Sequence, residues 1–564
     1  MSDRKPAPSP VRPEPWHRTI APWVFWPSVA IIGAFVLWAI IWDDAANRAV
    51  MALNSDVVGN LGWYYMVLVS LFVVFVVWVG LSRFGDIKLG KDDDKPDFST
   101  ASWLAMLFAA GMGIGLVYWG VAEPLTFYDS PRPGVEGGEA EAARAAFSQT
   151  FLHWGIHPWA IYVVVGLAIG YAVHRKGRPV SIRWALEPLL GDRVKGKAGD
   201  AIDVIALVGT VFGVATSLGF GVLQISAGAD FLGWADNPGT ALQVALIVGI
   251  TLLALISVLS GLAKGMKWLS NTNMVLFFCL MAFLLIAGST TLLLSDFTEN
   301  IGNYLQALPS LSFDTGAAYG EEGKSWVSGW TVFYWGWWIS WAPFVGIFIA
   351  RVSKGRTVRQ FVGGVLLVPA ALTFFWFSVV GGSAVHQERN EPGSMVGADG
   401  VNKDSALFQL LDHFPGGALV AGITMLLIVL FFVTSSDSGS YVVDMLASGG
   451  DPTPPRWSRV FWSVVEGTVA IALLVAAGSD ALTTLQTVAI IIALPFSFVM
   501  IAMCVATLKS FRAERAAYLA AQRRKTEERL IEEAVAALEE AEKVDKAAEL
   551  TKGAKAPVGG RTRR

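Results

Sequence analysis

The stretch Ala109–Gly120, AAGMGIGLVYWG, lies in an apolar run long enough to cross a membrane, yet it carries glycine at positions 111, 113 and 115. Glycine is among the poorest helix formers. Inside a bilayer, an interrupted helix is tolerated only where its free backbone groups are buried in protein or line a cavity. The stretch therefore predicts a broken helix at a binding site, with close helix packing by small residues as the alternative.

The composition of the chain is that of an integral membrane protein. Of its 564 residues, 54% are hydrophobic and only 16% are charged, and the mean hydropathy is +0.51. The near-neutral net charge of −3 gives no support for nucleic-acid binding. Cys279 and Cys504 lie in separate apolar runs, so we expect neither a disulfide nor a metal site from them.

About twelve segments are apolar enough to cross a bilayer, whose core needs about 20 helical residues. They lie near residues 22–42, 61–82, 101–127, 146–173, 202–229, 239–262, 270–295, 326–350, 359–385, 416–446, 458–478 and 481–508. We predict an all-α integral membrane protein. Residues 1–21 would form a Pro-rich tail, 22–508 the transmembrane domain, and 509–564 a charged tail.

Lysine and arginine are concentrated in the loops on one side of these spans. The 174–200 loop alone contains Arg175, Lys176, Arg178, Arg183, Arg193, Lys195 and Lys197. Because such residues mark cytoplasmic loops, we expect a multi-pass protein of the cell membrane with both termini in the cytoplasm. The amphipathic segment 297–325 is then expected along the outer membrane surface, and the polar loop 386–415 outside the cell.

The C-terminal tail is basic near residue 509 and acidic from about residue 527 onward. Its content of alanine, leucine and glutamate predicts a helix. Ile531, Val535 and Leu538 would share one face of it. The tail is interpreted either as a solvated helix or as an arm whose basic half contacts anionic lipid.

Tryptophans lie well inside two predicted spans, away from the interfaces where they are usual in membrane proteins. In the eighth span, Trp337 and Trp341 share a helix face and Trp338 lies about 100° around the axis. The fourth span adds Trp154, Trp159 and Tyr162. Packing is the usual role of such stripes, but converging electron-rich rings favour a cage for a quaternary ammonium.

Hydroxyl groups within the tenth span offer ligands to a hard monovalent cation. In LFFVTSSDSGSYVVD, Thr434 and Ser435 precede Gly439, where we expect a second helix break. Freed carbonyl groups, such as those of Ala109, Met112 and Phe431, would complete the ligand set. Hydrogen bonding between helices is the alternative for the hydroxyls. Asp437 is a functional candidate because it is a carboxylate within a span, or a cap for the break.

Four motifs give the sequence a resemblance to the betaine/choline/carnitine transporter family, and within it to sodium-coupled glycine betaine transporters. They are GMGIGLVYWGVAEPLTFY (Gly111–Tyr128), HWGIHPWAIY (His153–Tyr162), YWGWWISWAPFVG (Tyr334–Gly346) and TSSDSGSY (Thr434–Tyr441). The resemblance covers about residues 20–508. It implies a LeuT-like fold of two inverted five-helix repeats, spans 3–7 and 8–12, with broken helices at the midplane. It also implies a homotrimer whose charged terminal domains sense osmotic stress.

The resemblance also assigns roles to individual residues. It implies that the trimethylammonium cage consists of Trp154, Trp159, Tyr162 and Trp338, with Trp337 and Trp341 bordering the pathway. The backbone of Gly111 and Gly113 would meet the carboxylate end of the substrate. One sodium site would use Ala109, Met112, Phe431, Thr434 and Ser435. A second would lie near Thr216, Ser217 and Phe344.

The function that the resemblance implies is sodium-driven import of a zwitterionic quaternary ammonium compound that serves as a compatible solute. Glycine betaine is the first candidate for this substrate. No cofactor is implied besides the coupling ion Na⁺. Gly115 stands where choline-taking, proton-coupled relatives carry aspartate. No lysine or arginine lies between Lys197 and Lys264, whereas sodium-independent carnitine exchangers have a basic side chain near the sodium site. Both differences favour sodium coupling. Ectoine, proline, choline and carnitine are the alternative substrates.

Two hypotheses come from other classes of protein. His153 and His157, at i and i+4, could share a metal ion in a membrane enzyme, but the intervening glutamate of a zincin motif and a third ligand are missing. The second hypothesis is a ligand sensor or channel whose output is the C-terminal tail. No second folded domain is evident after the last span, which argues against a signalling role. We expect a transporter and no enzyme.

Overall fold

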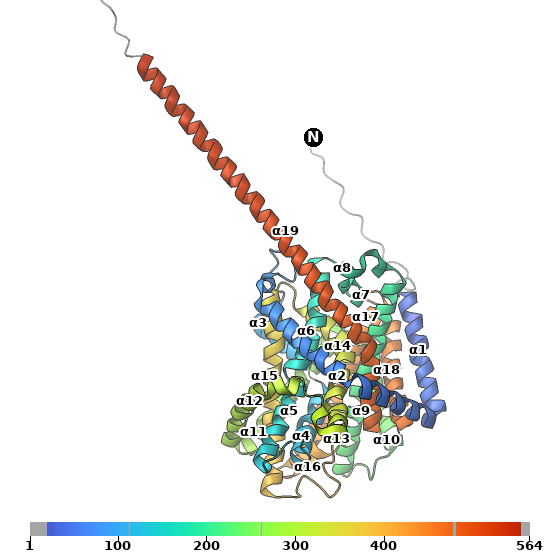
Figure 1. Ribbon diagram of the computed structural model, residues 1–564. Coiled ribbons are helices and arrows are strands. Elements are labelled where there is room, and N and C mark those ends of the chain that lie inside the picture. The colour runs from blue at the N-terminus through green and yellow to red at the C-terminus, as the bar shows by residue number, and fades with distance from the viewer. Residues whose placement is uncertain (1–19, 112, 261, 478–480, 554–564) are drawn as a thin grey trace, which may run out of the picture. The chain divides into compact units, whose positions relative to one another are not determined.

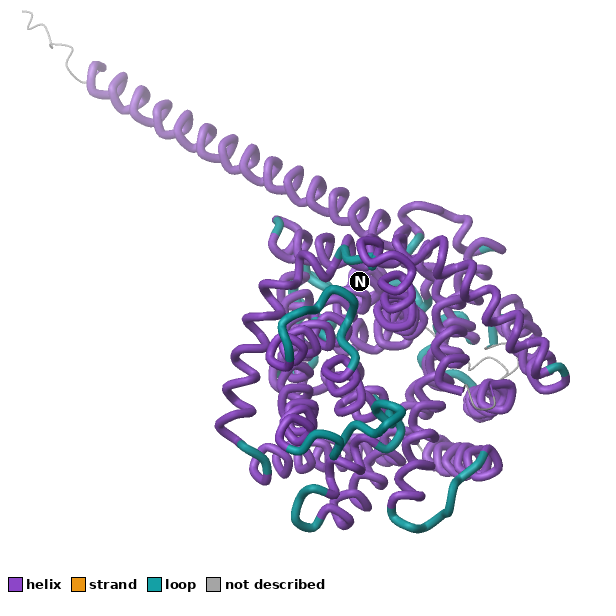
Figure 2. Tube along the Cα trace, turned by 60° about the horizontal axis from the view of Figure 1, so that its bottom comes forward, coloured by secondary structure: helices purple, strands orange, loops and turns teal. Residues whose placement is uncertain are grey.

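The computed structural model describes residues 20–111, 113–260, 262–477 and 481–553, and the regular structure in these ranges is helical (Figures 1 and 2). The α-helices are α1 (Pro22–Ile41), α2 (Asp43–Leu81), α3 (Thr100–Gly111), α4 (Ile114–Asp129), α5 (Glu139–Trp154), α6 (Ile156–Gly170), α7 (Ile182–Ala185), α8 (Glu187–Leu190), α9 (Lys197–Phe231), α10 (Thr240–Ser260), α11 (Leu262–Ala287), α12 (Thr290–Ser312), α13 (Gly320–Val327), α14 (Phe333–Val352), α15 (Val358–Asn390), α16 (Ala406–Asp412), α17 (Gly417–Ala447), α18 (Arg456–Ala477) and α19 (Ala481–Gly553). Short 3-10 or π turns are η2 (Arg83–Asp86), η3 (Tyr171–Arg175), η4 (Gly191–Lys195), η5 (Ala317–Tyr319) and η6 (Ser328–Val332).

The chain divides into two units, Met1–Thr507 and Leu508–Arg564. The first unit contains the helical bundle and the candidate site. The described part of the second unit is helical, and the predicted apolar face of the tail is exposed there, with Leu538 70% accessible. Each unit is described separately below.

Within the described residues, eleven helices are long and apolar enough to cross a membrane, against the twelve segments predicted. The missing one is the third, 101–127, which is divided into α3 and α4. Each half is too short to cross a bilayer core of about 30 Å alone. Gly113, in an extended conformation (φ −131°, ψ −158°), caps the start of α4. The predicted helix break is therefore confirmed.

A second break was not predicted from the sequence. The fourth span is interrupted at Gly155, between α5 and α6, where the backbone leaves the helical region (φ −98°, ψ −123°). A Cβ at this position would lie 2.5 Å from both the carbonyl oxygen of Phe151 and Cζ of Phe374. Glycine is thus required by the close approach of α5 and α15 at the break.

The break expected at Gly439 is wrong, because α17 is continuous from Gly417 to Ala447. A Cβ on Gly439 would lie 2.9 Å from Val214 of α9 and 3.2 Å from the carboxylate of Glu466 of α18. This glycine therefore allows three helices to pack closely. Asp437 consequently has no break to cap, and it accepts a 2.8 Å hydrogen bond from Ser257 of α10.

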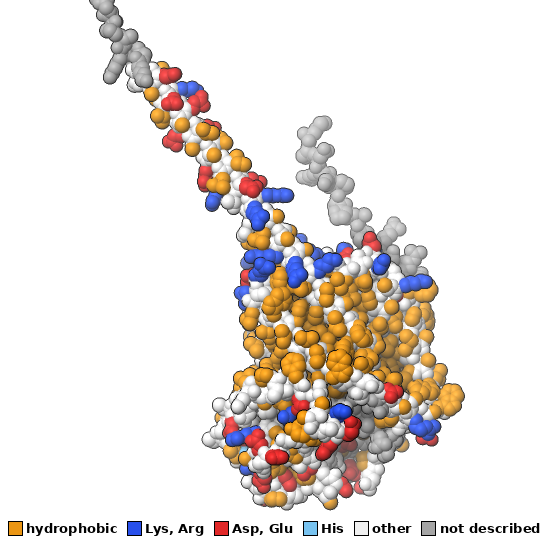
Figure 3. Space-filling view, viewed as in Figure 1, with side chains coloured by type: hydrophobic (Ala, Val, Ile, Leu, Met, Phe, Trp, Pro, Cys, Tyr) orange, Lys and Arg blue, Asp and Glu red, His pale blue; other side chains and the backbone are white. Residues whose placement is uncertain are grey.

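The centre of the bundle is α14, which packs against α6 and α9, while α4 packs against α5 and α15. Nearly all side chains of α4, α6 and α14 are buried. By contrast, α1, α10 and α11 expose large apolar side chains. Figure 3 shows the apolar side chains of one face as a broad band, with charged side chains gathered on either side of it. This arrangement fits a bundle immersed in a bilayer.

The amphipathic segment before the eighth span forms α12 and α13, and α12 packs on α5 and α15. Its buried face includes Leu293, Tyr304 and Leu311. Tyr304 stacks edge-to-face on Phe374 of α15 with ring centroids 5.1 Å apart. The helix therefore braces the break at Gly155, which lies beside the same Phe374 ring.

The packing of α15 against α3 can be tested at two adjacent glycines. A Cβ on Gly364 would lie 2.6 Å from Cζ3 of Trp103, a ring held by a 2.9 Å hydrogen bond to Ser353, whereas Gly363 has no neighbour within 4 Å. We expect Gly364→Ala to lower the free energy of unfolding by about 1–3 kcal/mol, because the ring must move. The control, Gly363→Ala, should leave it unchanged or raise it by up to about 1 kcal/mol. Thermal unfolding of the solubilised protein checks this, and equal losses for both variants would contradict the contact.

Candidate functional site

The break between α3 and α4 lies against the two helices that carry the predicted ligands. A Cβ on Gly113 would lie 3.3 Å from Cη2 of Trp341 on α14 and 3.6 Å from the hydroxyl oxygen of Ser435 on α17. The amides at the start of α4 form the positive end of its dipole, and the amide of Leu116 donates to the carbonyl of Gly113 at 3.2 Å. Gly111 is the last residue of α3. This backbone can therefore meet an anionic group close to Trp341.

Gly115, the second residue of α4, is in contact with the aromatic residues. A Cβ there would overlap Cη2 of Trp337 and lie 3.2 Å from Cη2 of Trp154. Glycine at this position is therefore required for the approach of α4 to both rings. An aspartate side chain would not fit while Trp337 keeps this position.

The predicted cage residues form one buried cluster. The rings of Trp337 and Trp338 are stacked, with centroids 4.5 Å apart and planes 15° apart. Trp154 meets Trp338 edge-to-face at 5.0 Å. Tyr162 lies 6.3 Å from Trp338 and 5.5 Å from Trp159. The structure thus brings together rings from α5, α6 and α14, although Trp159 reaches the cluster only through Tyr162.

Several polar atoms of this cluster lack hydrogen-bond partners among the described residues. They are the indole nitrogens of Trp337 and Trp341 and the hydroxyl of Tyr162. All three side chains are at most 4% exposed. Buried donors of this kind normally find a partner. Their presence beside the α3–α4 break is the pattern of a polar binding site lined by aromatic rings.

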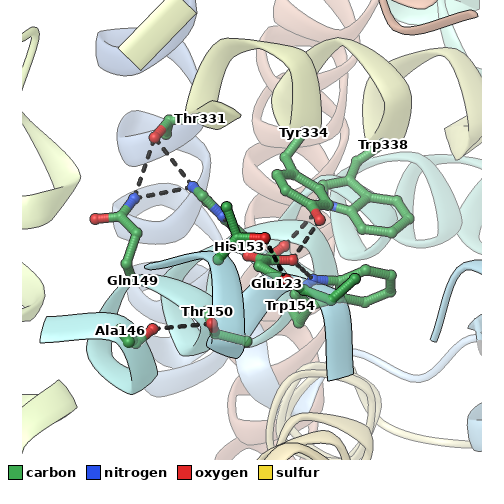
Figure 4. A network of polar contacts seen from close by, with 11 residues as sticks. Glu123, Ala146, Gln149, Thr150, His153, Trp154, Thr331, Tyr334 and Trp338 are labelled. Carbon is green, nitrogen blue, oxygen red and sulfur yellow. Dashed lines mark hydrogen bonds and ion pairs between the residues drawn. The ribbon is translucent and has the colours of Figure 1, made fainter. Parts of the chain in front are cut away.

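Behind the cage lies a buried polar network centred on Glu123 of α4 (Figure 4). Its carboxylate accepts hydrogen bonds from Nε1 of Trp154 at 2.7 Å, from Nδ1 of His153 at 2.7 Å, and from the hydroxyl of Tyr334. The Nε2 atom of His153 lies 2.9 Å from the amide nitrogen of Gln149 and 3.0 Å from the hydroxyl oxygen of Thr331. Both ring nitrogens of His153 therefore take part in the network around the carboxylate.

The sequence analysis missed Glu123, although it lies within the first family motif. The available indication was a carboxylate within an apolar run, GLVYWGVAEPL, because ionisable residues inside a membrane are functional candidates by default. Glu123 and His153 are both fully buried. Within the described residues, neither lysine nor arginine forms an ion pair with Glu123.

Most of the residues predicted for the first sodium site lie around a cavity of about 90 Å³. Its lining includes Phe431, Thr434 and Ser435 of α17 together with Trp341 and Phe344 of α14. The hydroxyl of Thr434 donates to the carbonyl of Leu430 at 2.9 Å, and its oxygen lies 3.4 Å from the side-chain amide of Asn273. A hydroxyl oxygen has two lone pairs, so one is left for a cation. Of the remaining ligands predicted for this site, Met112 lies outside the described residues and the side chain of Ala109 is not described.

The second predicted sodium site is less compact. Thr216 and Ser217 of α9 are buried and donate to carbonyls of their own helix, at Phe212 (2.9 Å) and Gly213 (3.3 Å). Phe344 lines the first cavity, whereas neither hydroxyl is among its lining residues. Phe344 therefore lies with the residues predicted for the first sodium site, whereas Thr216 and Ser217 lie on the neighbouring helix α9.

The proposed pairing of His153 and His157 on one helix face is wrong, because the break at Gly155 places them on α5 and α6. His153 has both ring nitrogens in the Glu123 network, and Nε2 of His157 lies 3.1 Å from the hydroxyl of Ser312. Among the described residues, histidine, cysteine and carboxylate side chains form no group of three that could hold a metal ion.

Comparison with known proteins shows the family of the chain. The model of the family described as "BCCT, betaine/carnitine/choline family transporter" matches residues 23–516. The glycine betaine transporter OpuD of Bacillus subtilis is 45% identical over 87% of this chain and 94% of its own length. Glycine betaine transporter 1 of Vibrio parahaemolyticus is 44% identical over the same shares. An uncharacterized transporter of Mycobacterium tuberculosis is 50% identical over 89% of this chain and 84% of its own. The chain therefore belongs to the betaine/carnitine/choline transporter family and is a multi-pass membrane transporter rather than an enzyme.

Proposed function

We propose that the protein is a secondary symporter that uses the sodium gradient to import a quaternary ammonium compatible solute, glycine betaine first. The observation that carries this proposal is the meeting of a broken helix, a buried aromatic cluster and a buried carboxylate at one place. Two relatives of about 45% identity are named as glycine betaine transporters. A LeuT-like arrangement of two inverted repeats, spans 3–7 and 8–12, is part of the proposal.

The cationic end of the substrate is held by Trp154, Trp159, Tyr162 and Trp338. Rings of this kind attract a desolvated cation with about 2 kcal/mol or more. The backbone at Gly111 and Gly113 meets the carboxylate end, next to Trp337 and Trp341, which border the pathway. The rings pack against one another in this structure, so the cation enters by separating them.

Glu123 gives this cage its electrostatic preference. Its carboxylate lies 2.7 Å from the indole nitrogen of Trp154. Accepting a hydrogen bond from the indole makes that ring more electron-rich. A carboxylate beside the cage in a low-dielectric environment favours a ligand with a cationic end.

Sodium binds beside Trp341, in the cavity that Thr434, Ser435 and Phe431 line. Ala109 and Met112 supply carbonyl oxygens to the same ion. A second ion uses Thr216, Ser217 and Phe344. Because Ser435 is adjacent to Gly113 at the α3–α4 break, an ion there stabilises the backbone that meets the substrate carboxylate. This shared backbone couples the two ligands.

The remaining features of the proposal concern the membrane and the assembly. Both termini lie in the cytoplasm of the cell, as the distribution of basic residues indicates. The protein works as a homotrimer, and the helical tail contacts anionic lipid through its basic half to sense osmotic stress.

The function is tested by uptake of labelled glycine betaine into proteoliposomes. We expect saturable accumulation above the external concentration when an inward sodium gradient is imposed, and no accumulation with potassium in its place. Uptake that is independent of sodium would overturn the coupling proposed here, and uptake that never saturates would indicate a channel. Competition by unlabelled ectoine, proline, choline and carnitine then ranks the substrates.

The cage is tested by Trp338→Leu. Loss of one desolvated ring contact, about 2 kcal/mol, should raise the KM for glycine betaine by about 10-fold or more. Trp335→Leu is the matched control, because Trp335 is equally buried in α14 but stacks on His157, outside the cage. We expect this control to reduce the amount of folded protein and to keep KM within about twofold. Equal KM changes in both variants would contradict the assignment of Trp338 to the binding site.

The charge of Glu123 is tested by Glu123→Gln, with Tyr334→Phe as control. Both variants remove a hydrogen bond from the same network, but only the first removes the charge. We expect Glu123→Gln to raise the KM for glycine betaine by about 10-fold, and Tyr334→Phe to raise it less. The discriminating measurement is inhibition by tetramethylammonium, which should weaken in Glu123→Gln alone. Equal weakening in both would assign Glu123 a purely structural role.

A further inference from the structure

Helix α18 presents a polar row to α17 that neither proposed sodium site includes. Its members are Arg459, Ser463 and Glu466, spaced i, i+4 and i+7 on one helix face. This face meets α17, because Ser436 donates to the carboxylate of Glu466 at 3.4 Å. A Cβ on Gly439 would lie 3.2 Å from the same carboxylate.

Helix α17 presents a matching polar row on its side of this interface. Asp437, Ser440 and Asp444 are spaced i, i+3 and i+7, so they share one face of the helix. Near the end of α17, Nε of Arg459 lies 3.9 Å from the carboxylate of Asp444. We call these two facing rows the α17–α18 seam.

Several polar atoms of the seam have no hydrogen-bond partner among the described residues. They are Oδ1 of Asp437, both carboxylate oxygens of Asp444, Nε of Arg459, Oγ of Ser463 and Oε1 of Glu466. These residues are at most 5% exposed. Buried polar atoms normally bond to protein or to ordered water. So many free polar atoms at one interface are typical of a site that takes a ligand together with water.

The seam also carries more negative than positive charge. Arg459 lies beside Asp444 and offsets its charge. Asp437 and Glu466 instead accept hydrogen bonds from serine hydroxyls, and in the part of the chain that the structure describes neither carboxylate forms an ion pair. Buried carboxylates without a cationic partner are costly, and within a membrane they mark ion sites by default. The inner end of the seam therefore calls for a cation.

The available donors suit a small hard cation. Carboxylate and hydroxyl oxygens are the ligands that hard cations take. The free oxygens of Asp437 and Glu466 supply two of them, and lone pairs of Ser257 and Ser436 lie beside these carboxylates. Calcium requires six to eight oxygen ligands, more than these side chains provide. A monovalent ion that keeps part of its water fits better.

We propose that a partly hydrated sodium ion binds in the α17–α18 seam between Asp437 and Glu466, as a third cation site of the protein. The choice of sodium rests on the proposed function, whereas the need for a cation rests on the seam itself. The site is separate from the cavity of Ser435, because residues two apart on a helix point about 200° apart. Neither Asp437 nor Glu466 is among the residues that line that cavity. The ion thus fixes α17 from the face opposite to its other sodium ligands.

The site is tested on the unmodified protein with a hydrophobic carbodiimide, which modifies buried carboxyl groups. The purified transporter is treated briefly in sodium, potassium or choline chloride of equal ionic strength, and labelling is quantified by mass spectrometry. We expect sodium to lower the labelling of Glu466 by about threefold or more relative to choline, because a bound ion occupies the carboxylate. Glu123, another fully buried glutamate, is the internal comparison and should change less.

Three outcomes of the labelling experiment would overturn the proposal. Equal labelling of Glu466 in sodium and choline would contradict a cation site in the seam. Equal protection of Glu123 would show a general conformational effect of sodium. Protection by potassium as strong as that by sodium would contradict the choice of ion.

Equilibrium binding of radioactive sodium to variants provides the second measurement. We expect Glu466→Gln, and likewise Asp437→Asn, to bind about one ion fewer per chain than the wild type. Glu388→Gln is the matched control and should bind as the wild type does. Its carboxylate is also buried, but it accepts hydrogen bonds from three backbone amides at 2.7–3.0 Å, outside the seam. Unchanged binding in both seam variants would remove the basis for the third site.

Failure of the seam and failure of the proposed function can be told apart. Thr434→Ala alters the first sodium site and should abolish sodium-driven uptake, yet sodium should still protect Glu466 in this variant. Loss of that protection would assign it to the first site and overturn the third. If the wild type itself shows no sodium-driven uptake of betaine, the proposed function fails, while protection of Glu466 by sodium still decides the seam.

Discussion

A carboxylate withdrawn from water inside an apolar bundle must be surrounded by hydrogen-bond donors, and for Glu123 these donors come from two other helices. Trp154 and His153 belong to α5, and Tyr334 belongs to α14. Removing one partner of a buried charge costs about 3–5 kcal/mol. These hydrogen bonds therefore fix the register of α4, α5 and α14 relative to one another. The register in turn determines the positions of the rings that face the site. Trp338 strengthens this register by donating to the carbonyl of His153 at 2.9 Å, where α5 ends.

The parts of the fold that follow from local chemistry could be predicted from the sequence. The spans are set by length and apolarity, and the break between α3 and α4 by three glycines within a span. The aromatic stripe of α14 follows from helical periodicity alone. The rings therefore gather as expected, although their binding role stays a prediction. The hydroxyls of Thr434 and Ser435 lie in one cavity with Phe431, whereas the presence of Phe344 and Trp341 in the same lining was not predicted.

The parts that depend on neighbouring helices could not be predicted. Gly155 and Gly439 both lie inside predicted spans, yet only the first interrupts its helix. The difference lies in what each glycine touches, a crowded Phe374 in one case and Val214 and Glu466 in the other. Glu123 escaped notice for the same reason, since its significance comes from donors 30 and more positions away in the chain. The i and i+4 spacing of His153 and His157 likewise does not place the two side chains on one helix face, because the helix is interrupted between them.

The contact between Gly115 and Trp337 has a consequence for how such a transporter could change its substrate. A side chain at position 115 would overlap the Trp337 ring, so any replacement of Gly115 must displace that ring. Its stacking partner Trp338 must then repack with it. Positions 115, 337 and 338 are therefore energetically coupled, and the effect of a substitution at one of them depends on the residues at the other two.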